Sequence, residues 1–340
     1  MAPGRRIAIT GISSHWGAEL ARRLERDPEV EFIAGIDTHP PPAELERTEY
    51  LEADLRSPTI SHLLPSIEVD TVVHCGILFY PEPGRPPRVL HEINVIGTLQ
   101  LLAACERTET LRNVIVRGSA AIYGCEGPSP AFFSEDMAGR LPMRTRFQRD
   151  ISELEEYFDN FARRHPQLTC TMLRYQPEIG PGLATPLVRY LSLPAVPVQL
   201  GFDPRLQLLH ADDATAAIEA AVKRPLRGAI NVAPSGSISL SRTLRILRRL
   251  PIPIPPPFFE PAVRRAGARL GAGSLLGDGI RLLRFGRGVD NTRLREELGF
   301  EPAYDAAGAV EELARASAGL KIGPSLHPGA LAGRLIGADR

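Results

Sequence analysis

Short apolar runs of strand length alternate with longer amphipathic stretches through the first half of this 340-residue sequence. This alternation restricts the possible folds more than any other feature. The runs that predict strands are residues 5–10, 32–36, 71–74, 113–118 and 169–173. The stretches that predict helices are residues 17–26, 89–107 and 145–164. Strands that alternate with helices in this way form a parallel sheet with helices on both faces. The sequence therefore predicts an α/β fold built on a doubly wound parallel sheet.

A glycine turn follows the first predicted strand, where residues 10–17 read T-G-I-S-S-H-W-G. Gly11 permits a tight turn, Gly17 lets helix and strand pack closely, and N–H groups at the helix start can face a pyrophosphate. Ser14 replaces the middle glycine of the usual pattern, and its hydroxyl could itself donate to a phosphate. Asp37 ends the second strand, where a carboxylate would bind adenosine ribose hydroxyls and disfavour a 2′-phosphate. A plain strand-turn-helix with a surface acid is the alternative, but the context favours NAD binding. The candidate contacts are Gly11, Ser14, His15, Trp16 and Asp37.

Composition argues against several other classes of protein. Forty Lys and Arg balance forty Asp and Glu, so no long-range field would attract nucleic acid. No apolar run reaches membrane-spanning length and no signal-peptide core is present, which predicts a cytoplasmic protein. The four cysteines are far apart and form no C-x-x-C pair, so we expect buried thiols and no metal site.

Further motifs follow in order along the chain. Ala53-Asp54-Leu55 comes after another predicted strand, and His74-Cys75-Gly76 ends the next one. The remaining motifs are N-V-I-G-T at 94–98, G-S-A-A-I-Y-G at 118–124, L-R-Y at 173–175, G-P-G at 180–182 and H-A-D-D at 210–213. Together they resemble the motifs of the extended short-chain dehydrogenase/reductases. This family contains NAD-dependent nucleotide-sugar epimerases and dehydratases, and 3β-hydroxysteroid dehydrogenases.

The resemblance implies a Rossmann-type domain with bound NAD and a homodimer paired through the helices at 89–107 and 145–164. It makes Ser119 the counterpart of the catalytic serine or threonine, although Asn94 could brace a helix rather than support the site. The further cofactor-binding residues that it implies are Asp54, Leu55, Cys75, Gly76, Asn94 and Tyr175. Pro177 stands where the family often has an asparagine, which argues against a nucleotide-sugar contact.

Proline and glycine become denser beyond residue 174, notably at 180–182 and 251–257. We expect a smaller α/β substrate lobe there. Its predicted helices are 212–223, 240–250 and 305–316, and its predicted strands are 206–209 and 229–232. The predicted domains are a Rossmann NAD-binding domain over 1–174, to which later strands return, the substrate lobe over 175–318 and a flexible tail over 319–340.

The tyrosine and lysine that perform the family's proton chemistry are missing. They would lie four residues apart on one helix face, and the motif positions place Phe147 and Ile151 there. The chain has only two lysines, Lys223 and Lys321, and neither follows a tyrosine by four residues. No tyrosine has an arginine four residues later either. We expect a repacked, more apolar pocket at this place.

Two functions remain open at this point. The first is a non-catalytic NAD-binding protein that acts as a sensor, scaffold or partner subunit. The second is an NAD-dependent oxidoreductase or epimerase for a nucleotide sugar or a steroid-like or lipid alcohol, with relocated proton-transfer groups. The candidates for such groups are Ser119, Tyr123, Tyr157, His74 and a group of the substrate itself. Either function would involve a small-molecule ligand that the sequence does not identify.

The C-terminal lobe offers a third possibility, contact with a lipid surface or a partner protein. Its segment 262–285 carries arginines among Leu, Ile and Phe residues. A helix that packs on its own domain with solvated arginines explains the same pattern and is favoured. Peripheral membrane contact is therefore possible but not the preferred interpretation.

Overall fold

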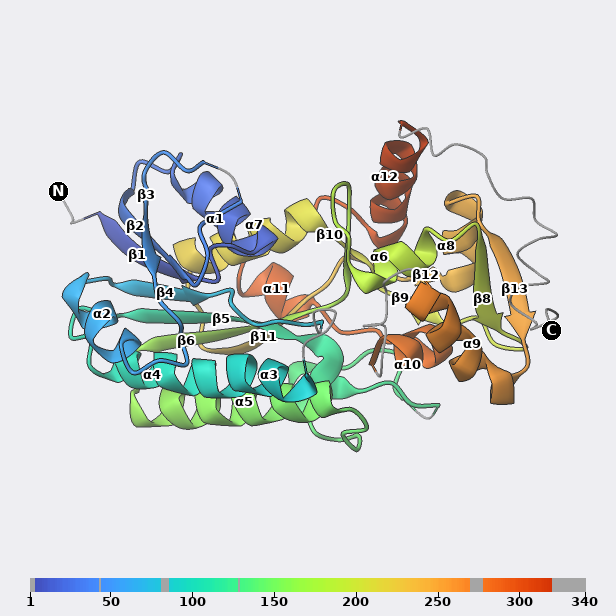
Figure 1. The fold of residues 1–340 in the computed structure, drawn as a ribbon, viewed down its shortest axis with the longest axis horizontal. Coiled ribbons are helices and arrows are strands. Elements are labelled where there is room, and N and C mark those ends of the chain that lie inside the picture. Colours follow the sequence, from blue (N-terminus) through green and yellow to red (C-terminus); the bar gives the residue numbers. More distant parts are fainter. Residues whose placement is uncertain (1–3, 43, 81–85, 128, 270–277, 320–340) are drawn as a thin grey trace.

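The computed structural model describes residues 4–42, 44–80, 86–127, 129–269 and 278–319 (Figure 1). Its largest feature is a parallel sheet of seven strands in the order β11-β6-β5-β4-β1-β2-β3. The strands are β1 (Arg5–Thr10), β2 (Val30–Asp37), β3 (Thr48–Glu52), β4 (Thr71–His74), β5 (Asn113–Ser119), β6 (Thr169–Tyr175) and β11 (Gly228–Val232). The strand order reverses between β1 and β4, which opens a crevice beyond the carboxyl ends of these strands. The predicted doubly wound α/β fold is confirmed.

Helices cover both faces of the sheet (Figure 1). The helices α1 (His15–Leu24) and α7 (Ala211–Lys223) lie together on one face. The other face is covered by α2 (Ile60–Ser66), α4 (Gly97–Glu106) and α5 (Arg146–Arg164). The single helix predicted for 89–107 is instead α3 (Pro87–His91), a π-helical turn (Glu92–Ile96) and α4. Such turns often occur at functional sites, and this one contains Asn94.

The start of α5 is fixed by its own sequence. Thr145 Oγ1 accepts a hydrogen bond from the backbone N–H of Gln148 at 3.1 Å, and Gln148 Oε1 accepts one from the N–H of Thr145 at 3.1 Å. This reciprocal capping satisfies two N–H groups that a helix start leaves unpaired. Because α5 begins there, Phe147 and Ile151 lie one turn apart on the same side of the helix.

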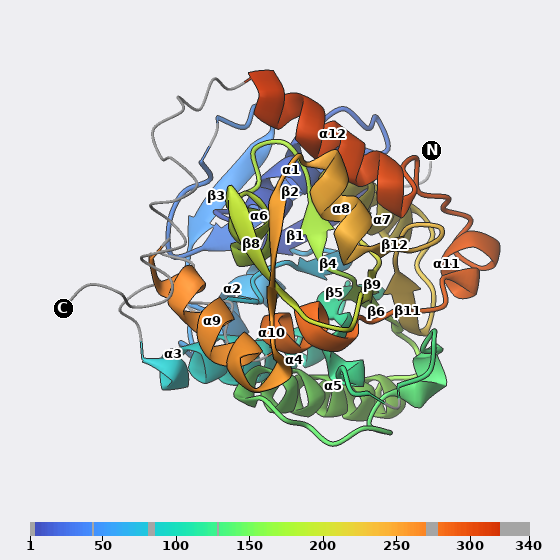
Figure 2. The ribbon, with the colours of Figure 1, turned by 90° about the vertical axis from the view of Figure 1, so that its right-hand side faces the viewer.

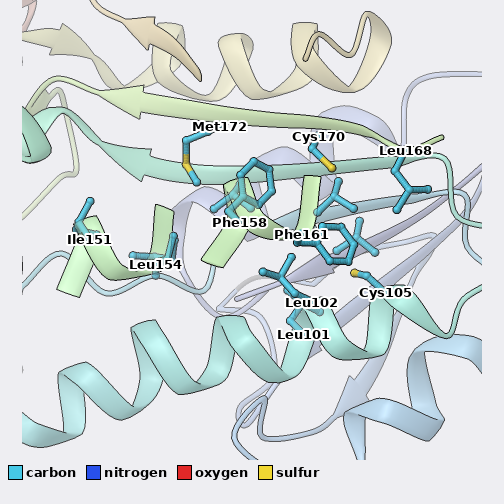
Figure 3. Packing of buried hydrophobic residues seen from close by; sticks show 14 of the residues in the cluster. Leu101, Leu102, Cys105, Ile151, Leu154, Phe158, Phe161, Leu168, Cys170 and Met172 are labelled. Atoms are coloured by element: carbon cyan, nitrogen blue, oxygen red, sulfur yellow. The ribbon is translucent and has the colours of Figure 1, made fainter. Parts of the chain in front are cut away.

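The main core lies between the sheet and the helices α4 and α5 (Figure 3). Leucines and a cysteine of α4 meet the apolar face of α5, and both contact side chains at the β6 end of the sheet. The labelled residues are Leu101, Leu102, Cys105, Ile151, Leu154, Phe158, Phe161, Leu168, Cys170 and Met172. A second cluster lies under α1 and α7, and all four cysteines are buried free thiols, as predicted.

The remaining elements form a smaller α/β lobe at one end of the sheet, with a core of its own (Figures 1 and 2). Its strands are β7 (Glu178–Ile179), β8 (Ala195–Gln199), β9 (Arg205–Leu206), β10 (Leu209–His210), β12 (Ile238–Ser239) and β13 (Leu250–Ile254), which pair two by two. Its helices are α6 (Pro186–Leu191), α8 (Leu240–Ile246), α9 (Pro256–Arg269), α10 (Asp278–Phe285) and α12 (Ala306–Gly319). A short helix, α11 (Thr292–Glu296), packs on β11 of the large sheet.

Several predictions for this half of the chain were wrong. The strand predicted at 229–232 is β11, and it lies beside β6 in the large sheet rather than in the lobe. The helix predicted for 240–250 ends at Ile246, and the proline-rich segment after it forms β13, which pairs with β8. Prolines are tolerated there because β13 belongs to a two-stranded sheet, where one edge of each strand has no partner to receive an N–H bond.

The strand predicted at 206–209 is divided between β9 and β10. The domain boundary after residue 174 remains a prediction, and the sheet combines strands from both sides of it. Residues 270–277 of the predicted amphipathic segment, and 320–340 of the predicted tail, lie outside the described residues. Among the helices described, none is long and apolar enough to cross a membrane.

Candidate functional site

The β1–α1 turn is shaped by two glycines that other residues could not replace without strain. Gly11 has a φ of +78°, and a Cβ there would lie 2.5 Å from the backbone N and Cα of Gly76. A Cβ on Gly17 would overlap the carbonyl oxygen of Gly11. The turn therefore packs directly against the chain after β4, and its backbone forms one wall of the crevice.

Ser14 caps α1 and has no free hydroxyl proton. Its Oγ accepts a hydrogen bond from the N–H of Gly17 at 3.1 Å and donates one to the carbonyl of Gly11 at 2.7 Å. The expectation that this hydroxyl donates to a phosphate is therefore wrong for this conformation. Among the described residues, no acceptor binds the backbone N–H groups of His15 and Trp16. These N–H groups remain available at the positive end of α1.

Asp37 ends β2 and reaches back to the same turn. Its Oδ2 accepts hydrogen bonds from the backbone N–H of Ser13 at 3.0 Å and from the Ser13 hydroxyl at 2.6 Å. Its Oδ1 accepts from the N–H of Thr38 at 2.7 Å and from the Thr38 hydroxyl at 3.4 Å. The Thr38 hydroxyl is closer to Nδ1 of His39, at 2.9 Å, so a ligand hydroxyl would displace only a long contact from the second acceptor position of Oδ1.

A cavity of about 750 Å³ extends from Asp37 across the turn to the ends of β4 and β5. Most of the predicted cofactor-binding residues line it, namely Gly11, Ser14, His15, Trp16, Asp37, Asp54, Leu55, Cys75 and Gly76. We call this the large cavity. Asn94 does not line it: its side-chain amide donates to the carbonyl of Leu78 and accepts from the N–H of Leu78, both at 2.8 Å. Asn94 therefore holds the segment after β4 in place.

A second, small cavity of about 90 Å³ contains the predicted catalytic position. Ser119 and Phe147 both line it, and the ring of Phe147 packs edge-on against Phe79 with centroids 6.0 Å apart. The Ser119 hydroxyl oxygen accepts a hydrogen bond from the N–H of Ala121 at 3.2 Å. Ile151 is fully buried in the core and lines neither cavity (Figure 3).

Tyr175, another predicted cofactor contact, lines the small cavity instead of the large one. Its hydroxyl donates to the carbonyl of Ala214 at 3.1 Å, and burial raises its pKa. With this hydrogen bond in place, Tyr175 presents its ring, rather than its hydroxyl, to neighbouring groups. Its contribution to the site is therefore apolar and aromatic.

Sequence reasoning missed a buried ion pair at the boundary of the two cavities. Arg117, on β5, is 1% exposed and its Nη2 donates to Oε1 of Glu178, on β7. Arg117 lines the large cavity, and Glu178 lines both. Burial raises the pKa of Glu178, and the neighbouring guanidinium opposes this rise. The one available signal was an arginine within an otherwise apolar strand.

The other candidates for relocated proton transfer lie away from both cavities. His74 Nδ1 is 2.6 Å from Thr10 Oγ1, its Nε2 is 3.0 Å from Thr98 Oγ1, and burial lowers its pKa to about 4. Burial also raises the pKa of Tyr123 to about 12. Its hydroxyl donates to Asn231 in a buried network that includes the ion pair between Arg174 and Glu155.

Tyr157, on α5, is partly buried against the main core, and its hydroxyl donates to Glu153 at 3.1 Å. Of the four proposed groups, only Ser119 lines a cavity. Within the described ranges, no group of three or more His, Cys, Asp or Glu residues is arranged to hold a metal ion.

Comparisons with known proteins agree with this architecture. The model of the NAD dependent epimerase/dehydratase family matches residues 7–233. An uncharacterized protein of Mycobacterium tuberculosis is 33% identical over 328 residues, which cover 95% of this chain and 86% of that protein. D-erythronate dehydrogenase of Haemophilus influenzae is 27% identical over 127 residues, 36% of this chain and 40% of the enzyme.

Solved structures show the same fold at low sequence identity. The dTDP-glucose 4,6-dehydratase of Bacillus anthracis, in complex with NAD, has a TM-score of 0.70 at 13% identity and covers 94% of this chain and 98% of its own. The UDP-glucuronic acid 4-epimerase of Bacillus cereus, also with NAD, has a TM-score of 0.68 at 16% identity, with 93% and 99% covered.

Proposed function

Because the chain belongs to the NAD dependent epimerase/dehydratase family, we propose that it binds NAD in the large cavity without performing the tyrosine-dependent chemistry of that family. The residues present fit the cofactor. Gly11 and Gly17 have no Cβ, so the turn can pack closely against its surroundings. The N–H groups of His15 and Trp16 can donate hydrogen bonds to a pyrophosphate. The second acceptor position of Asp37 Oδ1 is filled only by the Thr38 hydroxyl at 3.4 Å, so an adenosine ribose hydroxyl at the end of β2 could take that position.

One observation carries the non-catalytic part of the proposal. Phe147 presents a hydrocarbon ring to the small cavity beside Ser119, while Ile151 is fully buried in the core. A phenyl ring cannot exchange a proton, and an isoleucine supplies no positive charge to lower the pKa of a hydroxyl. Among the described residues, the Ser119 hydroxyl accepts a hydrogen bond from the N–H of Ala121 and donates none to a base. We therefore propose that the protein acts as an NAD-dependent sensor, scaffold or partner subunit.

The test combines binding with turnover. Titration calorimetry of the full chain should show NAD⁺ or NADH binding. A panel of alcohols, ketones and nucleotide sugars should then show no change in cofactor absorbance. Absence of binding would contradict the NAD proposal, and cofactor turnover with any panel member would contradict the non-catalytic proposal.

The second candidate function is an oxidoreductase in which Glu178 replaces the missing tyrosine. Its carboxylate lines both cavities, so it could accept the proton of an alcohol held beside Ser119. Bound NAD would supply the hydride acceptor. Apolar side chains such as Phe79, Leu90 and Leu282 line the small cavity and favour a lipid-like or steroid-like alcohol over a nucleotide sugar. Any turnover found in the panel should then be lost in E178Q.

We also propose a homodimer in the cytoplasm, following the family resemblance. Ile96 and Leu99, at the start of α4, are 37% and 39% exposed and could meet a second copy. Sedimentation equilibrium of the full chain tests this, and a monomeric mass at micromolar concentration would contradict it.

A further inference from the structure

Arg117 has an unusual environment for a guanidinium. Its Cζ lies 4.3 Å from the ring centroid of Phe79, 4.4 Å from that of Trp16 and 5.0 Å from that of Tyr175. Glu178 accepts a hydrogen bond from Nη2. The Nε and Nη1 atoms are buried, and neither has a hydrogen-bond partner among the described residues. A buried charged donor without a partner is costly, so these two nitrogen atoms would be stabilised by an acceptor that the described part of the chain does not provide.

The residues around Arg117 indicate where an acceptor would bind. Trp16 belongs to the first turn of α1, so the guanidinium lies close to the positive end of that helix. Its charge also contributes to lowering the pKa of His15, although burial of His15 is the larger cause. Arg117, His15 and Trp16 all line the large cavity. Two kinds of donor, the N–H groups at the start of α1 and the guanidinium of Arg117, thus belong to residues that line the same cavity, and both kinds suit an anion.

The side chain of Ser14 explains why a phosphate at the turn would need a further donor. Its Cβ narrows the approach to the turn, and its hydroxyl proton is already used by the carbonyl of Gly11. The turn therefore offers a phosphate less room than a turn with a middle glycine would. The guanidinium of Arg117, on β5 and in contact with Trp16, can supply the missing donors.

We propose that Arg117 is a cofactor-binding residue that contacts the pyrophosphate of the dinucleotide, through the Nε and Nη1 groups that the described residues leave unpaired. This inference rests on the proposed NAD binding and assigns a contact outside the glycine turn. Glu178 holds the guanidinium in place, and the three aromatic rings exclude competing water from it.

The fluorescence of a tryptophan can report ligand binding at Arg117. Trp16 is the only tryptophan, and it contacts Arg117 directly, so its fluorescence should change when a ligand reaches this position. Full-length wild type and R117M/E178Q would be titrated with NAD⁺, ADP-ribose and adenosine. The double variant removes both charges of the pair and so avoids leaving Glu178 buried and unpaired. Calorimetry of the same solutions provides a readout that does not depend on Trp16.

We expect NAD⁺ and ADP-ribose to bind R117M/E178Q about 10- to 100-fold more weakly, because a hydrogen bond to a charged group is lost. Adenosine, which has no phosphate, should bind equally to both proteins. R112M is the matched control, since Arg112 is exposed and directly precedes β5 at its opposite end. It should bind all three ligands as wild type does.

The outcomes separate the two proposals. If wild type binds neither NAD⁺ nor ADP-ribose, the proposed function fails and this contact with it. If wild type binds them and R117M/E178Q binds equally well or more tightly, only the Arg117 contact is overturned. Should the double variant fail to fold, R117K keeps a cation beside Glu178 but loses the separate Nε and Nη1 donors. We expect about tenfold weaker ADP-ribose binding by R117K, and unchanged affinity would overturn the contact.

Discussion

The site has two ends, the glycine turn in the large cavity and Ser119 in the small cavity. They follow the family pattern to different degrees. At the turn end, which comprises Gly11, Ser14 and Asp37, the residues that shape a dinucleotide site are present apart from the middle glycine. At the Ser119 end, Phe147 and Ile151 stand at the positions where the motif order predicts the proton-transfer pair. Both ends belong to the same sheet, so the fold does not require them to change together.

This difference shows that a binding crevice and a reactive centre depend on different kinds of residue. The turn end relies on backbone geometry, which Gly11 and Gly17 impose sterically. The Ser119 end would rely on two side chains, and the residues at their predicted positions, Phe147 and Ile151, pack in and against the main core. We expect the turn end to tolerate little change in shape and the Ser119 end to tolerate little added polarity.

The largest effect should come from I151K, which restores the family's lysine. Ile151 is fully buried among the apolar residues between α5 and the sheet, so the new ammonium would have no water and no partner (Figure 3). We expect a loss of about 3 to 5 kcal/mol in the free energy of unfolding. Urea denaturation followed by circular dichroism measures it.

F147Y is the matched control, because Phe147 borders a cavity and is only partly buried. A change below about 1 kcal/mol is expected for it. Equal stability of I151K and wild type would show that the Ser119 end still accommodates a lysine, and the contrast between the two ends would then disappear.

G11A changes the shape of the turn without changing any charge, so it tests whether NAD⁺ binding depends on that shape. The methyl group would meet the backbone of Gly76 at 2.5 Å and force a residue with a side chain to a φ of +78°. We expect a loss of about 3 kcal/mol of stability and no detectable NAD⁺ binding. G139A provides the comparison, since Gly139 has a φ of +76° with nothing within 4 Å of its Cβ position. NAD⁺ binding by a stable G11A protein would contradict the steric role of this turn.

His74, on β4 between β1 and β5, should make stability depend on pH. In the folded protein its pKa is lowered to about 4 by burial, against about 6.5 in an unfolded chain. The unfolded state therefore takes up a proton first as the pH falls, and the stability of the neutral buried ring is lost between about pH 6.5 and pH 4.

From pH 7 to pH 5 this linkage should remove about 2 kcal/mol from the wild type. H74N lacks the titrating ring, so its stability should fall by less over the same range. Urea midpoints at a series of pH values measure the difference. Parallel pH profiles for the two proteins would mean that His74 is not held neutral by its surroundings.

The sequence predicted the turn end more completely than the Ser119 end. Gly11 and Asp37 act through chain geometry and strand ends, which periodicity and glycine placement reveal. The hydrogen bonds of Ser14 were not predictable, because they depend on the carbonyl of Gly11 in the folded turn. Arg117 and Glu178 are 61 residues apart, and no local pattern links them.

The smaller lobe also contains structure that local sequence patterns could not predict. The proline-rich strand β13 is stabilised by pairing with β8, a contact that its own composition argues against. The interrupted helix before α4 likewise depends on packing. Its Asn94 reaches the backbone of Leu78 only once β4 is in place.

The smallest effect should come from D37N, which changes charge at the turn end while nearly preserving shape. Asn can still accept from Ser13 but has one acceptor fewer for a ribose hydroxyl and no negative charge. We expect about tenfold weaker NAD⁺ binding and a reduced preference for NAD⁺ over NADP⁺ in calorimetric titrations. E52Q is the control, because Glu52 pairs with Asp37 in the sheet but does not line the large cavity. If D37N and E52Q bind both dinucleotides alike, Asp37 does not select the cofactor, and the turn end would owe its binding to the backbone and Arg117 alone.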